Sequence, residues 1–153
     1  MRAEVIVEKK EDALKTASEW SDHQRTVWTD GSRLENGTVG AALAFKEKDG
    51  WATRGTYLGK NKEVFDAEVF AILQALNLLN DREEREQRYT VFSDSQAAIA
   101  RVQHDRTGPA QALAKAAIRA VNSITSRDST ITLRWTPVHA GVEGNEQVDE
   151  TAK

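Results

Sequence analysis

The chain has 153 residues, of which 39% are hydrophobic and 29% charged, and two are proline, a composition typical of one globular domain. No apolar run reaches the roughly eighteen residues of a membrane span, and "MRAEVIVEKKEDALK" lacks the apolar region of a signal peptide. The absence of cysteine excludes disulfides and thiolate metal sites and is compatible with a reducing compartment, so we expect an intracellular protein, cytoplasmic or nuclear.

The charge balance leaves the class of partner open. A net charge of −3, from 24 acidic and 21 basic residues, argues at first against nucleic acid, because phosphate binders are usually basic. If four of the 24 acids were metal ligands, however, 20 would remain against the 21 Lys and Arg. Charge therefore neither supports nor excludes a nucleic-acid partner, and it predicts weak electrostatic affinity.

The first third of the chain is predicted to form a meander of strands. Residues 1–24 are expected to be a lead-in or linker, with a short helix within "EDALKTASEW". Apolar runs separated by turn formers then predict three antiparallel strands, at 25–30, 39–47 and 51–59. We expect "GSRLENG" to be the loop after the first strand and Asp49-Gly50 to be the second turn.

The strongest helical pattern covers residues 64–80. Its apolar residues recur at steps of three and four, as on a core-facing helix: Phe65, Val69, Ile72, Leu76 and Leu79. Farther along, the pattern predicts a strand, two helices and another strand, at 88–94, 95–103, 109–125 and 129–138. Pro109 is expected at the first helical position. The loop "HAGVEGN" and a last helix from residue 146 complete the chain.

This order of elements predicts an α/β fold. Three strands, a helix, a strand, two helices, a strand and a helix give a mixed sheet of five strands, flanked by helices. Three of the strands would be antiparallel, and the others would follow by parallel crossovers. We place the domain at residues 25–153, and the sequence contains no internal repeat.

Four acids occupy special positions in this arrangement. Asp30 and Asp94 end predicted strands, Glu68 lies in the first turn and a half of the long helix, and Asp149 lies in the last helix. Each has an ordinary alternative role. Asp30 fits a hairpin turn, Asp94 a helix N-cap, Glu68 the rim of the core and Asp149 a solvated surface. Considered singly, the acids favour these alternatives.

Considered together, the four acids favour a metal site. The carboxyl ends of strands in such a sheet meet at a crevice where these folds bind ligands. Four carboxylates converging there would repel one another unless divalent cations neutralised them. Oxygen ligands suit Mg²⁺ or Mn²⁺, and two such ions about 3.5–4 Å apart form the clamp used for displacement at phosphorus. We therefore expect two Mg²⁺ ions, for which Mn²⁺ can substitute.

Four motifs carry a resemblance to a known family. "TDGS", "AEVFAILQAL", "SDSQ" and "HAGVEGNEQVDE" resemble, in order and approximate spacing, those of the ribonuclease H type 1 family over residues 26–152. The resemblance implies an RNase H-like fold and hydrolysis of the RNA strand of RNA–DNA hybrids, leaving 5′-phosphate and 3′-hydroxyl ends. It also implies that the catalytic, metal-binding carboxylates are Asp30, Glu68, Asp94 and Asp149.

The same resemblance implies five further site residues. His139, in "HAG", would assist proton transfer or product release from a loop, although a histidine in a surface loop is commonly idle. Gln96 would approach the minor groove of the hybrid, and Gly31 and Ser32 would contact the RNA strand. Asn145 would lie beside the last helix as a further substrate contact.

Two features differ from cellular members of this family. "EVFDAE" places Val64 and Phe65 where those members tend to carry a polar, asparagine-rich segment, and no lysine-rich insertion separates the third and fourth acids. The pattern is closer to retroelement-encoded domains, especially those of non-LTR retrotransposons. We therefore expect part of a polyprotein with reverse transcriptase, monomeric as an isolated domain. Contacts that bind the substrate would come from a fused polymerase or from scattered basic residues: Arg33, Lys46, Lys60 and Lys62.

Two alternative functions remain open. A catalytically weak or inactive domain could serve as a nucleic-acid-binding tether within a reverse transcriptase, but such domains usually lose an acid, and all four are present here. A transposase or integrase core would belong to the same superfamily. Such cores typically use three acids and lack the "HAG" ending.

Overall fold

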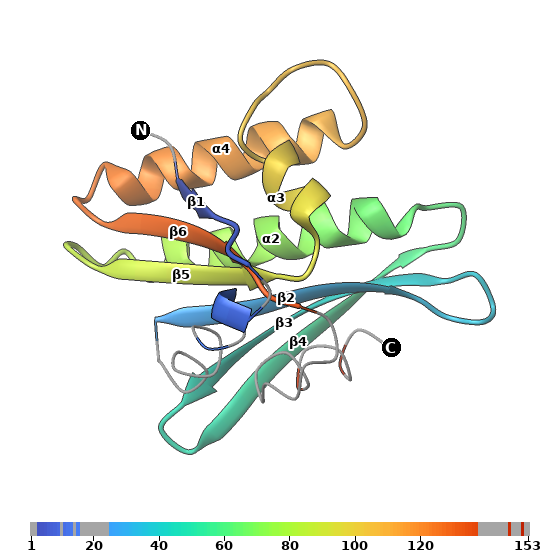
Figure 1. Ribbon diagram of the computed structural model, residues 1–153, viewed down its shortest axis with the longest axis horizontal. Coiled ribbons are helices and arrows are strands. Elements are labelled where there is room, and N and C mark those ends of the chain that lie inside the picture. The colour runs from blue at the N-terminus through green and yellow to red at the C-terminus, as the bar shows by residue number, and fades with distance from the viewer. Residues whose placement is uncertain are drawn as a thin grey trace.

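The computed structural model describes residues 3–9, 11–13, 15, 25–137, 147 and 151. Within these residues, six strands form one sheet, and three helices lie together on one side of it (Figure 1). In chain order the elements are β1 Glu4–Ile6, β2 Thr26–Arg33, β3 Val39–Glu47, β4 Gly50–Gly59, α2 Val64–Asp81, β5 Arg88–Ser93, α3 Gln96–Arg101, α4 Gln111–Thr125 and β6 Thr130–Trp135.

The sheet confirms the predicted fold class and corrects the number of strands. Its order is β1-β6-β5-β2-β3-β4, with β2, β3 and β4 antiparallel and the remaining pairs parallel. The expected count of five is wrong because β1, inside the predicted lead-in, pairs with β6 from Glu4↔Thr132 onward. An ion pair of 2.7 Å between Arg134 and Glu8 holds the segment just after β1 against the same strand. A three-residue strand is too short for an alternating pattern to reveal it.

Helix α2 lies at the centre of the core, as its apolar stripe predicts. Its buried face packs on β2, β3 and β5 and against α3 and α4. A capping box begins the helix: Glu63 accepts from the third helical residue, Asp66, whose side chain accepts from the backbone of Glu63. Among the described residues, no helix is both long and apolar enough to cross a membrane.

Strand β2 continues past the point where the sequence predicted its end. Gly31 pairs with Ala41 and Arg33 with Val39, so the residues expected to open a loop belong to the antiparallel ladder. The turn lies farther on, where Leu34 donates its backbone N–H to Thr38 at 2.8 Å. The alternative interpretation of Asp30 and Gly31 as a hairpin turn is therefore wrong.

The start of α4 also differs from the prediction. The helix begins at Gln111, so Pro109 is not its first residue, and the N-cap Ala110 adopts a left-handed conformation with φ 57°. The buried side chain of Arg101 explains the shift, because it donates hydrogen bonds to the backbone carbonyls of Arg106 and Pro109 at 2.7 and 2.6 Å. The chain wraps around this guanidinium before the helix can begin.

The face of the sheet opposite the helices carries an aromatic stack. Trp28 and Phe92 pair in register on β2 and β5, with ring centroids 4.2 Å apart and planes 10° from parallel. Their chain neighbours Val27 and Val91 belong to the core under the helices, and side chains alternate along a strand. The stack therefore stiffens the two strands that carry the predicted acids.

Candidate active site

The register of the sheet brings Asp30 and Asp94 together. In the parallel pair β2–β5, the last matched residues are Thr29 and Ser93, so the two acids follow at adjacent positions. β2 continues beyond this point through its pairing with β3, where Asp30 lies opposite Ala42. Asp30 is thus held inside a ladder and is 3% exposed. Its carboxylate accepts the backbone N–H of Gly31 at 2.9 Å.

Asp94 lies in the short connection between strand β5 and helix α3. The hydrogen bonds between β5 and β6 end one residue earlier, where the carbonyl of Ser93 accepts the N–H of Thr136 at 2.9 Å. One residue later, Ser95 caps α3, since its side chain accepts the N–H of Ala98 at 3.1 Å. The alternative role of Asp94 as the helix N-cap is therefore excluded, and its carboxylate belongs to the acid cluster.

Glu68 reaches the cluster from α2 because that helix lies unusually close to β2. A Cβ placed on Gly31 would be 2.7 Å from the backbone nitrogen of Glu68 and 2.9 Å from the Cβ of Ala67. Small side chains on both elements allow the same approach next to it, where Ala67 and Ala71 pack against Val39 and Ala41 on β3. Glycine at position 31 therefore lets the glutamate lie beside the two aspartates.

The three carboxylates form one compact cluster. One oxygen from each of Asp30, Glu68 and Asp94 lies within 4.8 Å of the other two. Burial, followed by the charges of Asp94 and Asp30, raises the pKa of Glu68 to about 10, and a backbone hydrogen bond from Gly31 opposes this rise. A side-chain hydrogen bond with Asp94 acts in the same direction as burial. Without a cation, Glu68 therefore holds a proton at neutral pH.

The cluster has the donor set of a divalent cation site. All three groups offer only oxygen, which suits hard cations such as Mg²⁺ and Mn²⁺. The Oε2 atom of Glu68 is buried and has no hydrogen-bond partner among the described residues. A buried acceptor without a partner is costly, and a cation placed among the three acids would satisfy it and remove their mutual repulsion. The residues present therefore fit such an ion.

The comparison with known proteins identifies the family. The sequence profile of the RNase H family matches residues 22–153. The chain belongs to the RNase H family. Among solved structures, that of RNase H1 from the halophilic archaeon Halobacterium salinarum NRC-1 is similar in fold, with a TM-score of 0.59 and 22% identity over 83% of this chain and 92% of that chain. No curated protein matches the sequence.

The other site residues predicted for this RNase H chain lie partly within and partly outside the described residues. Asp149, His139 and Asn145 lie outside the described residues. Ser32 is half-buried on β2, two residues beyond the first acid, and Gln96 is exposed as the first residue of α3. Both therefore lie within two residues of an acid of the cluster. Gly31, predicted as an RNA contact, lies against the backbone of α2.

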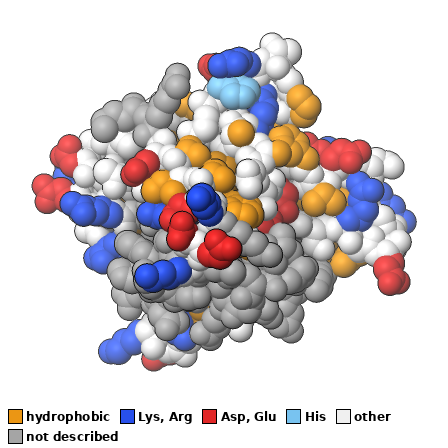
Figure 2. Space-filling view, in the orientation of Figure 1, with side chains coloured by type: hydrophobic (Ala, Val, Ile, Leu, Met, Phe, Trp, Pro, Cys, Tyr) orange, Lys and Arg blue, Asp and Glu red, His pale blue; other side chains and the backbone are white. Residues whose placement is uncertain are grey.

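The basic residues expected to grip substrate are divided between two places. Arg33 donates to the carbonyl of Lys62 at 3.0 Å, which brings the end of β2 and the start of α2 together near the acids. Lys46 lies at the other end of β3, with its Nζ 5.5 Å from the ring centroid of Trp51. Among the described residues on the face shown in Figure 2, acidic and basic side chains are interspersed and do not form one basic surface.

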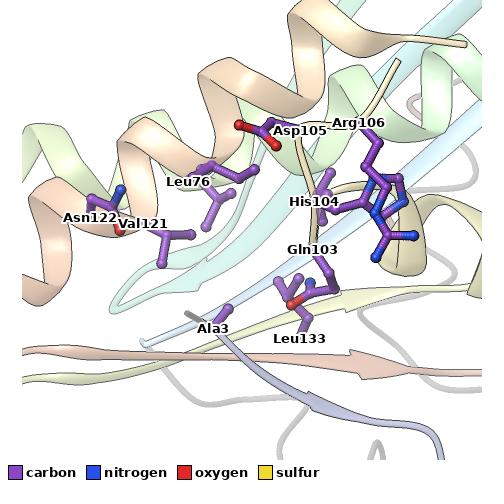
Figure 3. A pocket seen from close by; sticks show the side chains of 11 residues that line it. Ala3, Leu76, Gln103, His104, Asp105, Arg106, Val121, Asn122 and Leu133 are labelled. Carbon is purple, nitrogen blue, oxygen red and sulfur yellow. The ribbon is translucent and has the colours of Figure 1, made fainter. Parts of the chain in front are cut away.

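A large cavity lies away from the acid cluster. It has a volume of about 630 Å³ and opens between β1, β6, α4 and the chain that follows α3 (Figure 3). Its apolar lining includes Leu76, Val121 and Leu133, and its polar lining includes Gln103 and His104. None of the three acids lines it, so its size gives no reason to place the chemistry there.

Sequence reasoning missed one neighbour of the acids. The indole Nε1 of Trp135 donates to the backbone carbonyl of Asp94 at 3.2 Å. Trp135 ends β6 directly opposite Ser93, the last residue of β5. The indole reaches the acid only because these two strands pair in parallel, and no local motif in either segment predicts this contact.

Proposed function

We propose that this RNase H domain is an endonuclease that hydrolyses the RNA strand of RNA–DNA hybrids with two divalent metal ions. The observation that carries the proposal is the convergence of Asp30, Glu68 and Asp94 within 4.8 Å, with a buried glutamate oxygen that lacks a hydrogen-bond partner among the described residues. Mg²⁺ is the proposed cofactor, with Mn²⁺ as a substitute. The products are 5′-phosphate and 3′-hydroxyl ends.

The carboxylates have distinct tasks in this proposal. Asp30, fixed within a ladder, and Asp94, between a strand and a helix, hold the ions, together with Glu68 and Asp149. When bound, two such ions supply an activated water for attack on the scissile phosphate and charge stabilisation for the departing 3′ oxygen. Glu68 gives up its proton when a cation binds, because a nearby positive charge favours the ionised carboxylate.

The substrate contacts are proposed from their positions beside the acids. Ser32 and the backbone of Gly31 would face the RNA strand, and Gln96 the minor groove. Arg33 and Lys62, which approach each other beside the start of α2, would contact phosphates. Recognition of backbone and groove shape gives no sequence preference, whereas reading 2′-hydroxyls restricts cutting to RNA.

Residues of the C-terminal motif complete the proposed site. His139 would assist proton transfer or product release, and Asn145 would contact the substrate. The wider setting that we propose is a retroelement polyprotein with reverse transcriptase, acting inside the cell, with the isolated domain monomeric. The interspersed charges on the face shown in Figure 2 agree with a domain that relies on a fused polymerase for part of its grip.

The test is cleavage of a labelled RNA–DNA hybrid. Asp94→Asn should abolish Mg²⁺-dependent cleavage while its circular dichroism spectrum matches that of the unaltered protein. His139→Ala should slow turnover without eliminating it. If the unaltered protein leaves the hybrid uncut with Mg²⁺ or Mn²⁺ at high protein concentration, the isolated domain is not an enzyme. Binding of the hybrid without cutting would then favour the tether.

A further inference from the structure

The geometry points to Trp135 as a positioning residue for the carboxylate of Asp94. Its indole N–H donates to the backbone carbonyl of that acid at 3.2 Å, from the neighbouring strand. This inference rests on the proposed function, because it concerns how precisely one member of the acid cluster is held. Trp135 has no direct contact with a reacting group in this proposal.

Asp94 needs such support because of its place in the chain. The strand ladder ends at Ser93, whose carbonyl accepts from Thr136, and the helical hydrogen bonds begin at Ser95, whose carbonyl accepts from Ile99. A second local hydrogen bond, from the N–H of Ser95 to the side chain of Ser93 at 3.1 Å, restrains the same connection between β5 and α3. The Asp94–Ser95 peptide plane is thus the link between two regular elements. The bond from Trp135 restrains the rotation of that plane, and with it the direction of the Asp94 side chain.

The tryptophan is itself well anchored. Trp135 is half-buried and packs against the hydrophobic core, while its backbone pairs with Ser93 in the β5–β6 ladder. A large aromatic side chain has only two rotatable bonds, so one that is packed in this way loses little further freedom by donating a hydrogen bond. Its hydrogen bond therefore holds the backbone carbonyl of Asp94 in a fixed position relative to β6.

The other described tryptophans do not share this arrangement. The Nε1 atom of Trp28 is buried and has no hydrogen-bond partner among the described residues. Trp51 lies on β4 beside Lys46, at the end of β3 away from the acid cluster. Trp51→Phe therefore makes the same chemical change as Trp135→Phe at a place remote from the acids, and it serves as the matched control.

The expected effect is on metal binding and turnover and not on substrate affinity. Trp135→Phe removes the N–H donor and keeps an aromatic ring against the core. We expect kcat for hybrid cleavage to fall about three- to tenfold at fixed Mg²⁺, as for the loss of one ordinary hydrogen bond, with KM for the hybrid unchanged. The dissociation constant for Mn²⁺, measured by calorimetry without nucleic acid, should rise by a similar factor.

A second variant separates the hydrogen bond from the packing of the ring. Replacing Trp135 with benzothienylalanine keeps the bicyclic shape and exchanges only the N–H for sulfur, so it remains informative if Trp135→Phe does not fold. Weaker Mn²⁺ binding in this variant, with Trp51→Phe unchanged, would support the inference. Unaltered Mn²⁺ binding and kcat would overturn it and leave Trp135 a purely structural residue. If the unaltered protein fails to cut the hybrid, the proposed function fails, while the Mn²⁺ comparison still decides the role of Trp135.

Discussion

Gly31 and the backbone of Glu68 meet with no room for a side chain between them. A Cβ at position 31 would lie 2.7 Å from the amide nitrogen of Glu68, a distance that real Cβ contacts essentially never show. The backbone on both sides is fixed, by the β2–β3 ladder and by the capped helix α2. The contact therefore sets how close the glutamate lies to the two aspartates.

Gly31→Ala should impair both stability and catalysis. The added methyl group must push α2 away from β2, and such overpacking costs about 1–3 kcal/mol of unfolding free energy. A displacement of the glutamate by about 1 Å should lower kcat for hybrid cleavage roughly 100-fold. Urea denaturation and single-turnover cleavage would measure the two effects.

The matched control for that substitution is Gly55→Ala on the edge strand β4. Among the residues that the structure describes, a Cβ there would approach only Thr151, at 3.4 Å, which is an ordinary contact distance. We expect stability and cleavage close to those of the unaltered protein. Equal behaviour of the two alanine variants would show that the helix can shift without disturbing the acids.

The metal-free protein should lose stability as pH rises. The pKa of Glu68 is raised from 4.5 to about 10 in the fold, so the folded state holds a proton that the unfolded chain releases above about pH 4.5. The stabilisation from this proton is fully present below about pH 4.5 and is lost as pH rises toward about 10. Denaturation in chelator across this range should show the decline.

Glu68→Gln tests the origin of that decline. The amide cannot ionise, so the variant should unfold with a flatter pH dependence and should be more stable than the unaltered protein at pH 8, where the buried glutamate loses stability by its tendency to ionise. Glu47→Gln, at an exposed position at the end of β3, should keep the slope of the unaltered protein. An unchanged slope in Glu68→Gln would mean that another group is responsible. Added Mg²⁺ should stabilise the unaltered protein more than this variant.

Arg101 should be among the most sensitive positions outside the acid cluster. Its side chain is 7% exposed and donates to the carbonyls of His104, Arg106 and Pro109 at 3.0, 2.7 and 2.6 Å. Arg101→Met leaves these acceptors without their donor, and we expect a loss of about 3 kcal/mol in urea denaturation. Arg119→Met, on the exposed face of α4, should change stability by less than about 0.5 kcal/mol. A small loss at position 101 would show that water replaces the guanidinium there.

Ala110 offers a stabilising substitution. It caps α4 with φ 57° and ψ 29°, a left-handed conformation that costs a residue with a Cβ about 1 kcal/mol. Ala110→Gly should therefore raise the melting temperature, through a gain of up to about 1 kcal/mol. Ala112→Gly, just inside the same helix, should lower it, because glycine weakens helices. The same sign for both variants would contradict the proposed cause.

The fold class could be predicted because the sequence pattern of each long helix or strand lies within that element's own residues. The apolar stripe of α2 predicted a helix at 64–80 that the structure places at Val64–Asp81, and β3 has its predicted bounds. Hydrophobic periodicity fixes such elements because one face of each must be buried. β1 escaped prediction because three residues carry no periodic signal and pair only with a strand formed far along the chain.

The convergence of three of the four acids, Asp30, Glu68 and Asp94, could be predicted from the sequence, but the contacts that hold them in place could not. Asp30 and Asp94 stood out as acids beside buried strands, and the register then brought them together. The role of Gly31 depends on how closely a helix approaches, and that of Trp135 on a neighbouring strand. Both are properties of packing between segments remote in sequence. The late start of α4 also depends on such packing, because Arg101 donates hydrogen bonds to backbone carbonyls of the loop that precedes this helix.

The pairing of β1 with β6 has a consequence for how the chain folds during synthesis. Glu4 lies beside Thr132, so the first strand made must wait until the last strand of the sheet has left the ribosome. The hairpins of β2, β3 and β4 need no such delay, because their partners are adjacent in sequence. Contacts between distant segments close late because of the entropy of the long loop between them. Among the described strands, β1 therefore waits longest for its partner, and the segment carrying Glu4 is exposed to other partners during that time.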